Sequence, residues 1–221
     1  MGTIEVVLGD ITDQNVEAIV VAARAGRPGH AIACDRTSGP FVIHTAAPAW
    51  FNGRGGEDEE LSDCYANSLV VAEELEVGSI AFGPIATDFP TEVAAEIATT
   101  AIRSLPIIDT IRLVAPDQET CDALRTNLVK PIVELCPTCG AKARPIAYGR
   151  RTGGVWQAAS AGLVVMYGCL VRGDGTDPYW ECTADNEHRW TNGERDERRT
   201  QIAIEEAIAV TLGEDHPVHP A

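Results

Sequence analysis

The chain lacks any apolar run near the roughly 18 residues that a membrane span needs, and no basic, apolar leader follows Met1. These absences argue against a membrane partner and predict a cytoplasmic protein. The 221 residues are 45% hydrophobic and 23% charged, which is typical of folded globular proteins. A chain of this length can form one large domain or two smaller ones, and we favour two.

Positive charge is also scarce. The chain has 17 Lys and Arg residues against 33 Asp and Glu residues, a net charge of −16 at pH 7. Residues 1–135 carry 8 basic and 21 acidic side chains, whereas residues 136–221 carry 9 and 12. Because nucleic-acid binding depends on Lys and Arg neutralising phosphates, we do not expect a nucleic-acid partner.

Closely spaced cysteine pairs are almost absent. There are seven cysteines, an odd number, and only Cys136 and Cys139 are close neighbours. This pattern argues against a disulfide framework and favours free thiols or metal ligands.

Short apolar runs alternate with amphipathic stretches through residues 1–135. Five runs are typical of buried strands, namely residues 4–8, 18–23, 41–44, 79–82 and 110–114. Helical spacing marks residues 61–72, 93–101 and 124–132. The acidic run from Glu57 to Glu60 should begin the first helix at the surface, and Asp117 should cap the last. The alternation predicts an α/β domain, a three-layer α/β/α sheet that ends near Leu135.

The remaining residues predict a smaller module and a terminal helix. Short strand pieces are expected at residues 180–182 and 189–190, and residues 195–212 have an amphipathic helical pattern. We therefore divide the chain into a domain at 1–135, a module at 136–190, and a C-terminal helix and tail at 191–221.

The smaller module begins with the metal-binding pattern Cys136-Pro-Thr-Cys139-Gly. Two thiolates at this spacing can hold one zinc ion, and the alternative, a redox pair, lacks the strand-to-helix context it needs. Cys182 and His188 are the predicted third and fourth ligands, with Asp185 as the substitute for His188. Cys169 is a core thiol or a spare ligand. Four protein ligands predict a structural zinc ion.

This segment resembles the zinc ribbons of small bacterial proteins. The similarity lies in residues 136–140, in Pro145-Ile-Ala-Tyr-Gly149, in Gly168-Cys169, and in Cys182 with His188-Arg-Trp190. The fourth cysteine of that pattern is missing, with Asp185 near its place. The resemblance implies little about activity.

The first domain resembles a macrodomain, the ADP-ribose-binding α/β fold. The similarity is carried, in family order, by Gly9-Asp-Ile-Thr12, residues 16–23, the strand 41–44 with its I-H-x-x-x-P continuation, residues 61–69 and residues 79–82. It implies that Asp10 and the backbone of Ile11 recognise an adenine amino group. The alternative for Asp10 is a helix cap near Thr12, and we weigh the two evenly.

The same comparison shows which parts of the family's ligand machinery have changed. The family's N-A-A-N motif is Val21-Ala22-Ala23-Arg24 here, so both asparagines are gone. Residues 25–32 are a shortened relic of the glycine loop and its helix, after which an element has been lost. The second phosphate loop is residues 86–90, Ala-Thr-Asp-Phe-Pro, where Asp88 replaces a glycine and would repel a diphosphate.

The resemblance implies a protein that binds an adenine nucleotide, a nucleoside or an ADP-ribose-related ligand without efficient hydrolysis. The predicted ligand-binding residues are Asp10, Ile11, Ala22, Thr87 and Phe89. The first alternative is an ADP-ribosyl hydrolase or deacetylase, for which His30, His44 and Asp88 are the nearby acid-base groups. The second is a scaffold or regulatory protein that acts through the zinc ribbon, as a homodimer or with a protein partner.

Overall fold

The computed structural model describes residues 3–23, 26–34, 39–52, 55–105, 108–149, 152–168, 172, 176–191 and 196–213. The chain forms two compact units, Met1–Val129 and Lys130–His219. The division falls after Val129 rather than near Leu135, and the C-terminal helix belongs to the second unit. Among the described residues, no helix has the length and apolar character needed to cross a bilayer.

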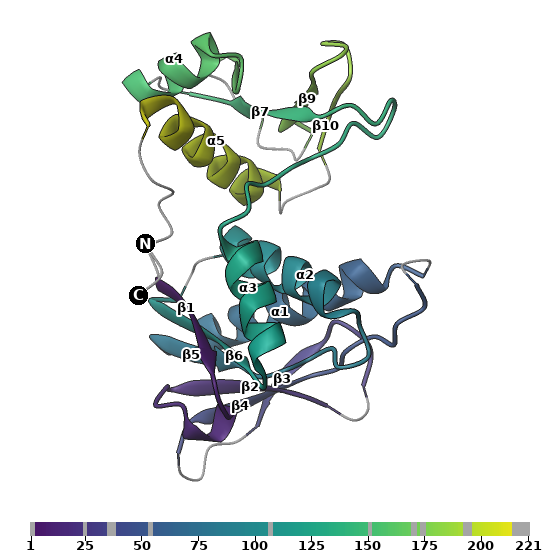
Figure 1. Cartoon of the computed structure of the whole chain (residues 1–221), viewed down its shortest axis with the longest axis vertical. Coiled ribbons are helices and arrows are strands. Elements are labelled where there is room, and N and C mark those ends of the chain that lie inside the picture. The colour runs from purple at the N-terminus through teal and green to yellow at the C-terminus, as the bar shows by residue number, and fades with distance from the viewer. Residues whose placement is uncertain are drawn as a thin grey trace. The chain divides into compact units, whose positions relative to one another are not determined.

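The first unit is built on a six-stranded sheet in the order β1-β6-β5-β2-β4-β3 (Figure 1). The strands are β1 (Thr3–Leu8), β2 (Ala18–Ala22), β3 (Ala31–Cys34), β4 (Phe41–Thr45), β5 (Ser79–Phe82) and β6 (Thr110–Ala115). All neighbours pair in parallel except β3, which runs antiparallel to β4 at the edge. The α/β class and the five expected strands are confirmed, but β1, which was expected to be a buried strand, has no buried residue.

Three helices cover one face of this sheet: α1 (Glu57–Glu74), α2 (Thr91–Ser104) and α3 (Gln118–Leu128) (Figure 1). The described elements of the first unit thus keep the expected α/β class but form two layers instead of the predicted three. Right-handed crossovers explain why α1 and α2 share a face, because β4, β5 and β6 follow one another across the sheet in one direction. Helix α3 follows β6 and packs beside α2. Fully buried side chains of the strands, such as Val20, Ile43 and Ile111, pack against the helices in one core. The third predicted helix ends at Leu128, so Ile132 lies outside it.

The segment between β2 and β4 differs from its prediction. Residues 25–32 were expected to retain part of a helix, but the described residues there form a turn and then the edge strand β3. His44, one of the acid-base groups named for the hydrolase alternative, lies outside the core. Ile43 and Thr45 face the core, whereas His44 is half-buried on the other face of β4. The period-two alternation of a strand accounts for this placement.

The second unit is a four-stranded sheet with two helices. Its sheet order is β10-β9-β7-β8, made by β7 (Ala143–Ala147), β8 (Val165–Met166), β9 (Trp180–Cys182) and β10 (Arg189–Trp190). Helices α4 (Gly153–Ser160) and α5 (Asp196–Leu212) pack together. Gly154 makes this contact possible, since a Cβ there would lie 2.7 Å from Ile208 Cγ2. One small apolar cluster contains Ala158, Val164 and Ile204 with partly buried neighbours, and Ile146 and Trp180 are buried as well.

Candidate functional site

A cavity of ≈ 260 Å³ lies in the first unit at the carboxyl ends of β5 and β6. Its lining comprises residues 83–87 and Phe89 of the loop after β5, Pro116 and Asp117 after β6, and small side chains of α2. Ligands of open parallel sheets bind at this edge, where loops leave adjacent strands. The lining residues include no Lys, Arg or His, so the cavity is apolar with a few hydroxyl groups and one carboxylate.

Asp10 and Ile11 adjoin this edge of the sheet from β1. The Gly9 N–H donates to the Ala115 carbonyl at the end of β6, at 3.0 Å. The Ile11 side chain lies against Gly83, where an added Cβ would be 3.3 Å from Ile11 Cδ1. Gly83 lines the cavity. The predicted adenine corner and the cavity are therefore contiguous along the strand ends.

The Asp10 carboxylate caps the short 3-10 helix Ile11–Asp13. Its Oδ1 accepts hydrogen bonds from the Thr12 N–H at 2.8 Å and the Thr12 hydroxyl at 2.7 Å. These two bonds, the hydroxyl first, lower the pKa of Asp10. Both bonds use Oδ1, and Oδ2 has no partner among the described residues. The helix cap, one of the two roles considered for Asp10, is therefore observed. The Oδ2 oxygen could still accept a hydrogen bond from a ligand.

The loop after β5 is held in place by its own side chains. Phe89 is 6% exposed and its ring lies 4.7 Å from that of Trp50, centroid to centroid. Thr87 and Asp88 are both exposed, and the Asp88 carboxylate accepts the Trp50 backbone N–H at 3.1 Å. Thr87 and Phe89 thus line the cavity, whereas Asp88 joins the loop to the segment after β4. Their predicted role in ligand binding stays a prediction.

Ala22 is exposed at the end of β2, opposite Thr45 in the neighbouring strand, and is not a lining residue of the cavity. The turn that follows is packed tightly. Gly29 has a φ of +80°, and a Cβ there would lie 2.9 Å from Asp63 Cβ. Asn67 Nδ2 donates to the Gly29 carbonyl at 2.7 Å. The turn therefore closes onto α1, and Arg24 lies outside the described residues.

The sequence did not single out the two lining residues Asp117 and Tyr65 as parts of a ligand site. Asp117 was expected only as a cap, and it does accept the Thr120 N–H at 2.8 Å. Tyr65 is almost completely buried, and this burial raises its pKa. The position of Asp117 directly after β6 was the available signal, because polar residues at the carboxyl ends of adjacent strands converge.

Glu57 is a second residue whose environment differs from the prediction. It was expected at the surface, but it is 2% exposed. Its carboxylate accepts the Phe51 N–H at 3.0 Å and the Gly55 N–H at 2.6 Å. The first acidic residue of α1 thus fixes the loop before the helix, and Asp58 and Glu59 remain exposed.

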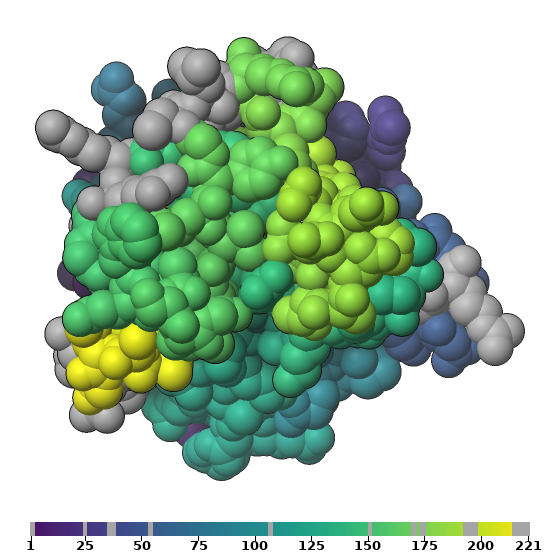
Figure 2. All heavy atoms as spheres, turned by 90° about the horizontal axis from the view of Figure 1, so that it is seen from above, coloured from purple at the N-terminus to yellow at the C-terminus, as the bar shows by residue number. Residues whose placement is uncertain are grey.

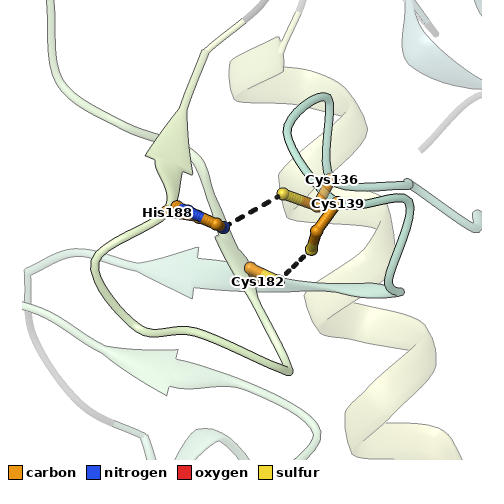
Figure 3. Close-up of side chains that lie close together, drawn as sticks. All are labelled: Cys136, Cys139, Cys182 and His188. Atoms are coloured by element: carbon orange, nitrogen blue, oxygen red, sulfur yellow. Dashed lines mark hydrogen bonds between the residues drawn. The ribbon is translucent and has the colours of Figure 1, made fainter.

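The predicted metal ligands converge in the second unit (Figure 3). The ligand atoms of Cys136, Cys139, Cys182 and His188 all lie within 4.8 Å of one another, so the group could hold a metal ion. Cys139 Sγ is 3.4 Å from Cys182 Sγ, and Cys136 Sγ is 3.7 Å from His188 Nδ1. Ligands around a tetrahedral zinc ion would be separated by about 3.8 Å between sulfurs and about 3.6 Å between sulfur and nitrogen. The observed spacings agree with such a geometry.

Local hydrogen bonds shape both halves of this cluster. In the first half, the Gly140 N–H donates to the Cys136 carbonyl at 2.8 Å, and Gly140 takes a φ of +71°, which glycine adopts at little cost. In the second half, the Ala184 N–H donates to Cys182 Sγ at 3.3 Å. Donors of this kind stabilise thiolates.

Asp185 supports the histidine instead of joining the four clustered ligand atoms. One Asp185 oxygen lies 3.6 Å from His188 Nε2, while His188 Nδ1 faces Cys136. Metal-bound histidines commonly carry a carboxylate on the second ring nitrogen, which fixes the ring and its tautomer. The geometry therefore favours His188 over Asp185 as the fourth ligand. Cys169, the possible spare ligand, lies outside the described residues.

The two cysteines of the first half have different pKa shifts. Burial raises the pKa of Cys136, but the N–H groups of Cys139 and Thr138 lower it by more, and the net pKa is about 6. The Ala141 N–H lowers the pKa of Cys139, but the Cys182 and Cys136 sulfurs outweigh it, so the net pKa is raised. Ionisation of Cys136 is thus favoured, whereas ionisation of Cys139 is disfavoured by the neighbouring sulfurs. A bound cation would stabilise both thiolates.

Solved structures identify the fold of the first unit. A point mutant of the Oceanobacillus iheyensis macrodomain, solved with ADPR, matches 57% of this chain and 92% of its own length, with a TM-score of 0.53 and 23% identity. The Oceanobacillus iheyensis macrodomain solved with ADP matches 57% of this chain and 90% of its own length, also with a TM-score of 0.53 and 23% identity. At this identity the likeness shows a macrodomain fold.

Sequence relatives then identify the family. The Macro domain model matches residues 3–98. A macro domain-containing protein of Methanosarcina mazei is 31% identical over 160 residues, which cover 55% of this chain and 86% of that protein. A macro domain-containing protein of Cupriavidus necator is 34% identical over 167 residues, 57% of this chain and 96% of that protein. The chain belongs to the macrodomain family.

Proposed function

We propose that the first unit binds an adenine nucleotide, a nucleoside or an ADP-ribose-related ligand and does not hydrolyse it efficiently. The observation that carries this proposal is the ≈ 260 Å³ cavity at the carboxyl ends of β5 and β6, contiguous with Asp10 and Ile11. Its apolar walls and few polar groups are typical of small-molecule sites. Binding of ADP and ADPR by the Oceanobacillus macrodomain supports the choice of ligand.

In this proposal each residue has a separate role. Asp10 Oδ2 accepts the adenine amino group, and Ile11 offers its backbone and an apolar wall. Phe89 packs against the ligand from the buried side of the loop, and Thr87 offers a hydroxyl from the exposed side. Ala22, at the end of β2, marks the outer limit of the site.

The weak acid-base equipment of the cavity supports binding without efficient hydrolysis. His30 is exposed in the turn before β3, and His44 is half-buried on the sheet face opposite the helices. Neither residue is among those that line the cavity. Asp88 accepts the Trp50 N–H, and the lining carboxylate of Asp117 caps α3. A general base must reach the proton that it removes, so the hydrolase alternative has less support.

Isothermal calorimetry on the full chain tests the binding proposal with adenosine, AMP and ADP-ribose. We expect measurable binding of at least one ligand, and at least tenfold weaker binding by Asp10→Ala and Phe89→Ala, which remove a polar partner and a stacking wall. Glu73→Gln, an exposed substitution at the far end of α1, serves as the control. Absence of heat with all three ligands would contradict the proposal, as would unchanged binding by Asp10→Ala.

We further propose that Cys136, Cys139, Cys182 and His188 bind a structural zinc ion. This proposal rests on the clustering of their four ligand atoms, which all lie within 4.8 Å of one another. Four protein ligands leave no open position for substrate or water. Elemental analysis of the purified chain should find one zinc ion per molecule. Cys182→Ser should lose it, whereas Cys34→Ser, an exposed cysteine of the first unit, should retain it.

A further inference from the structure

We infer that Asp88 makes the cavity selective for an uncharged nucleoside over its phosphorylated forms. The inference rests on the proposed function and narrows its ligand class. Asp88 stands in the loop after β5, between the lining residues Thr87 and Phe89. Its carboxylate accepts the Trp50 N–H at 3.1 Å. The Trp50 N–H therefore already donates to a protein carboxylate and is not free to donate to an anionic group of a ligand beside this loop.

Part of the loop's backbone cannot donate hydrogen bonds to a ligand. Pro84 and Pro90 have no N–H. The Gly83 N–H donates to the Val20 carbonyl at 3.1 Å, and the Phe89 N–H donates to the Ala86 carbonyl at 3.4 Å. A phosphate group needs several converging donors to replace its water shell. Half of the eight residues from Gly83 to Pro90 therefore cannot serve in such a cradle.

The charges around the cavity point in the same direction. Its lining contains the Asp117 carboxylate and no Lys, Arg or His, and Asp88, which is not a lining residue, adds a second carboxylate in the adjoining loop. Both carboxylates are exposed, so solvent and salt partly screen their repulsion of a phosphate, but no cation of the lining offsets it. An uncharged ribose hydroxyl meets no such penalty. The Trp50–Phe89 ring contact holds Asp88 at this position, because the two rings join the same pair of loops.

The test compares adenosine with AMP by calorimetry on the full chain and on Asp88→Asn. Asparagine retains an oxygen that can accept the Trp50 N–H but removes the charge. We expect the wild-type chain to bind adenosine at least tenfold more tightly than AMP, and Asp88→Asn to reduce that preference by about tenfold. Glu73→Gln removes one negative charge at the opposite edge of the sheet and should leave the preference unchanged.

Ionic strength gives a second measurement that requires no variant. Raising the salt from about 50 mM to about 500 mM should strengthen AMP binding relative to adenosine, because salt screens repulsion. Equal selectivity in wild type and Asp88→Asn, with no effect of salt, would overturn the inference while leaving the proposed function intact. Tighter binding of AMP than of adenosine by the wild type would also overturn the inference. Failure of both ligands to bind either protein would overturn the proposed function itself.

Discussion

The two units of the chain hold their folds by different means. Among the described residues, 24 buried side chains form the main apolar cluster of the first unit, whereas the second unit has a cluster of three and a few further buried side chains, such as Ile146 and Trp180. So small a core offsets little of the conformational entropy that the second unit loses on folding. The second unit instead has four convergent metal ligands on two segments far apart in the sequence. A metal ion joining these segments would supply the missing stability.

The largest expected effect follows from removing the metal. Treatment with a strong chelator, or Cys182→Ser, should unfold the second unit and leave the first folded, because structural zinc contributes on the order of 10 kcal/mol in small domains. Cys139 is exposed, and Figure 2 shows the segment that carries β9 and β10 (yellow-green) at the surface of the molecule, so a chelator has access. Hydrogen exchange read separately for residues 3–129 and 130–213 measures the effect.

Cys34→Ser is the control for this prediction, since it changes an exposed cysteine of the first unit. It should leave both exchange profiles unchanged. Amides of β7 and α5 that stay protected after complete metal removal would show that the small core suffices, and the comparison between the units would then fail.

Truncating a core side chain of the first unit should destabilise that unit and leave the second unit unaffected. Ile111 is fully buried in β6, and Ile111→Ala should cost about 2–5 kcal/mol of the free energy of unfolding of that unit. Ile32, at 66% exposure in β3, provides the matched control, and Ile32→Ala should cost about 0.5 kcal/mol or less. Denaturant unfolding gives both values, with zinc content as the check on the second unit. Similar costs for the two variants would contradict a core centred on β6.

The buried carboxylate at the start of α1 should give an intermediate effect. Glu57→Gln should destabilise the first unit by about 1–3 kcal/mol, because an amide group can accept only one of the two backbone N–H donors well. Glu59→Gln changes an exposed residue of the same helical turn and should have little effect. Urea unfolding of the two variants measures the difference. Equal stability of Glu57→Gln and the wild type would contradict the prediction, because it would mean that water can replace the carboxylate as the acceptor for the Phe51 and Gly55 N–H groups.

The sequence predicted best the features that depend on local pattern. The parallel strands were recognisable because residues 4–8 and 18–23 are short, mainly apolar runs. The metal cluster was recognisable because Cys136 and Cys139 have a spacing set by ligand geometry. The edge strand β3 was missed, since Ala31-Ile-Ala-Cys34 is short and follows a glycine-rich turn that resembled a phosphate loop. Its strand conformation comes from pairing with β4, a tertiary effect.

Long-range contacts could not be predicted from pattern. The burial of Glu57 depends on the path of the preceding loop, which returns the Phe51 and Gly55 donors to the helix. The Asp88 contact with Trp50 joins residues 38 positions apart. The cavity needs the loops after β5 and β6 to be placed side by side by the sheet order. The polarity of these residues was visible in the sequence, but their partners were not.

The smallest expected effect concerns the cap of α3 and depends on pH. The Thr120 backbone N–H lowers the pKa of Asp117 below its ordinary value of 3.8. The stabilisation is therefore complete above pH 4 and is lost as the pH falls through the lower folded-state pKa. Asp117→Asn keeps a capping oxygen without a titrating charge, so the melting temperatures of the two proteins should converge between pH 4 and pH 3. Asp122→Asn, an exposed change in the same helix, should show no such convergence. A constant difference between wild type and Asp117→Asn from pH 7 to pH 3 would contradict the ionised cap.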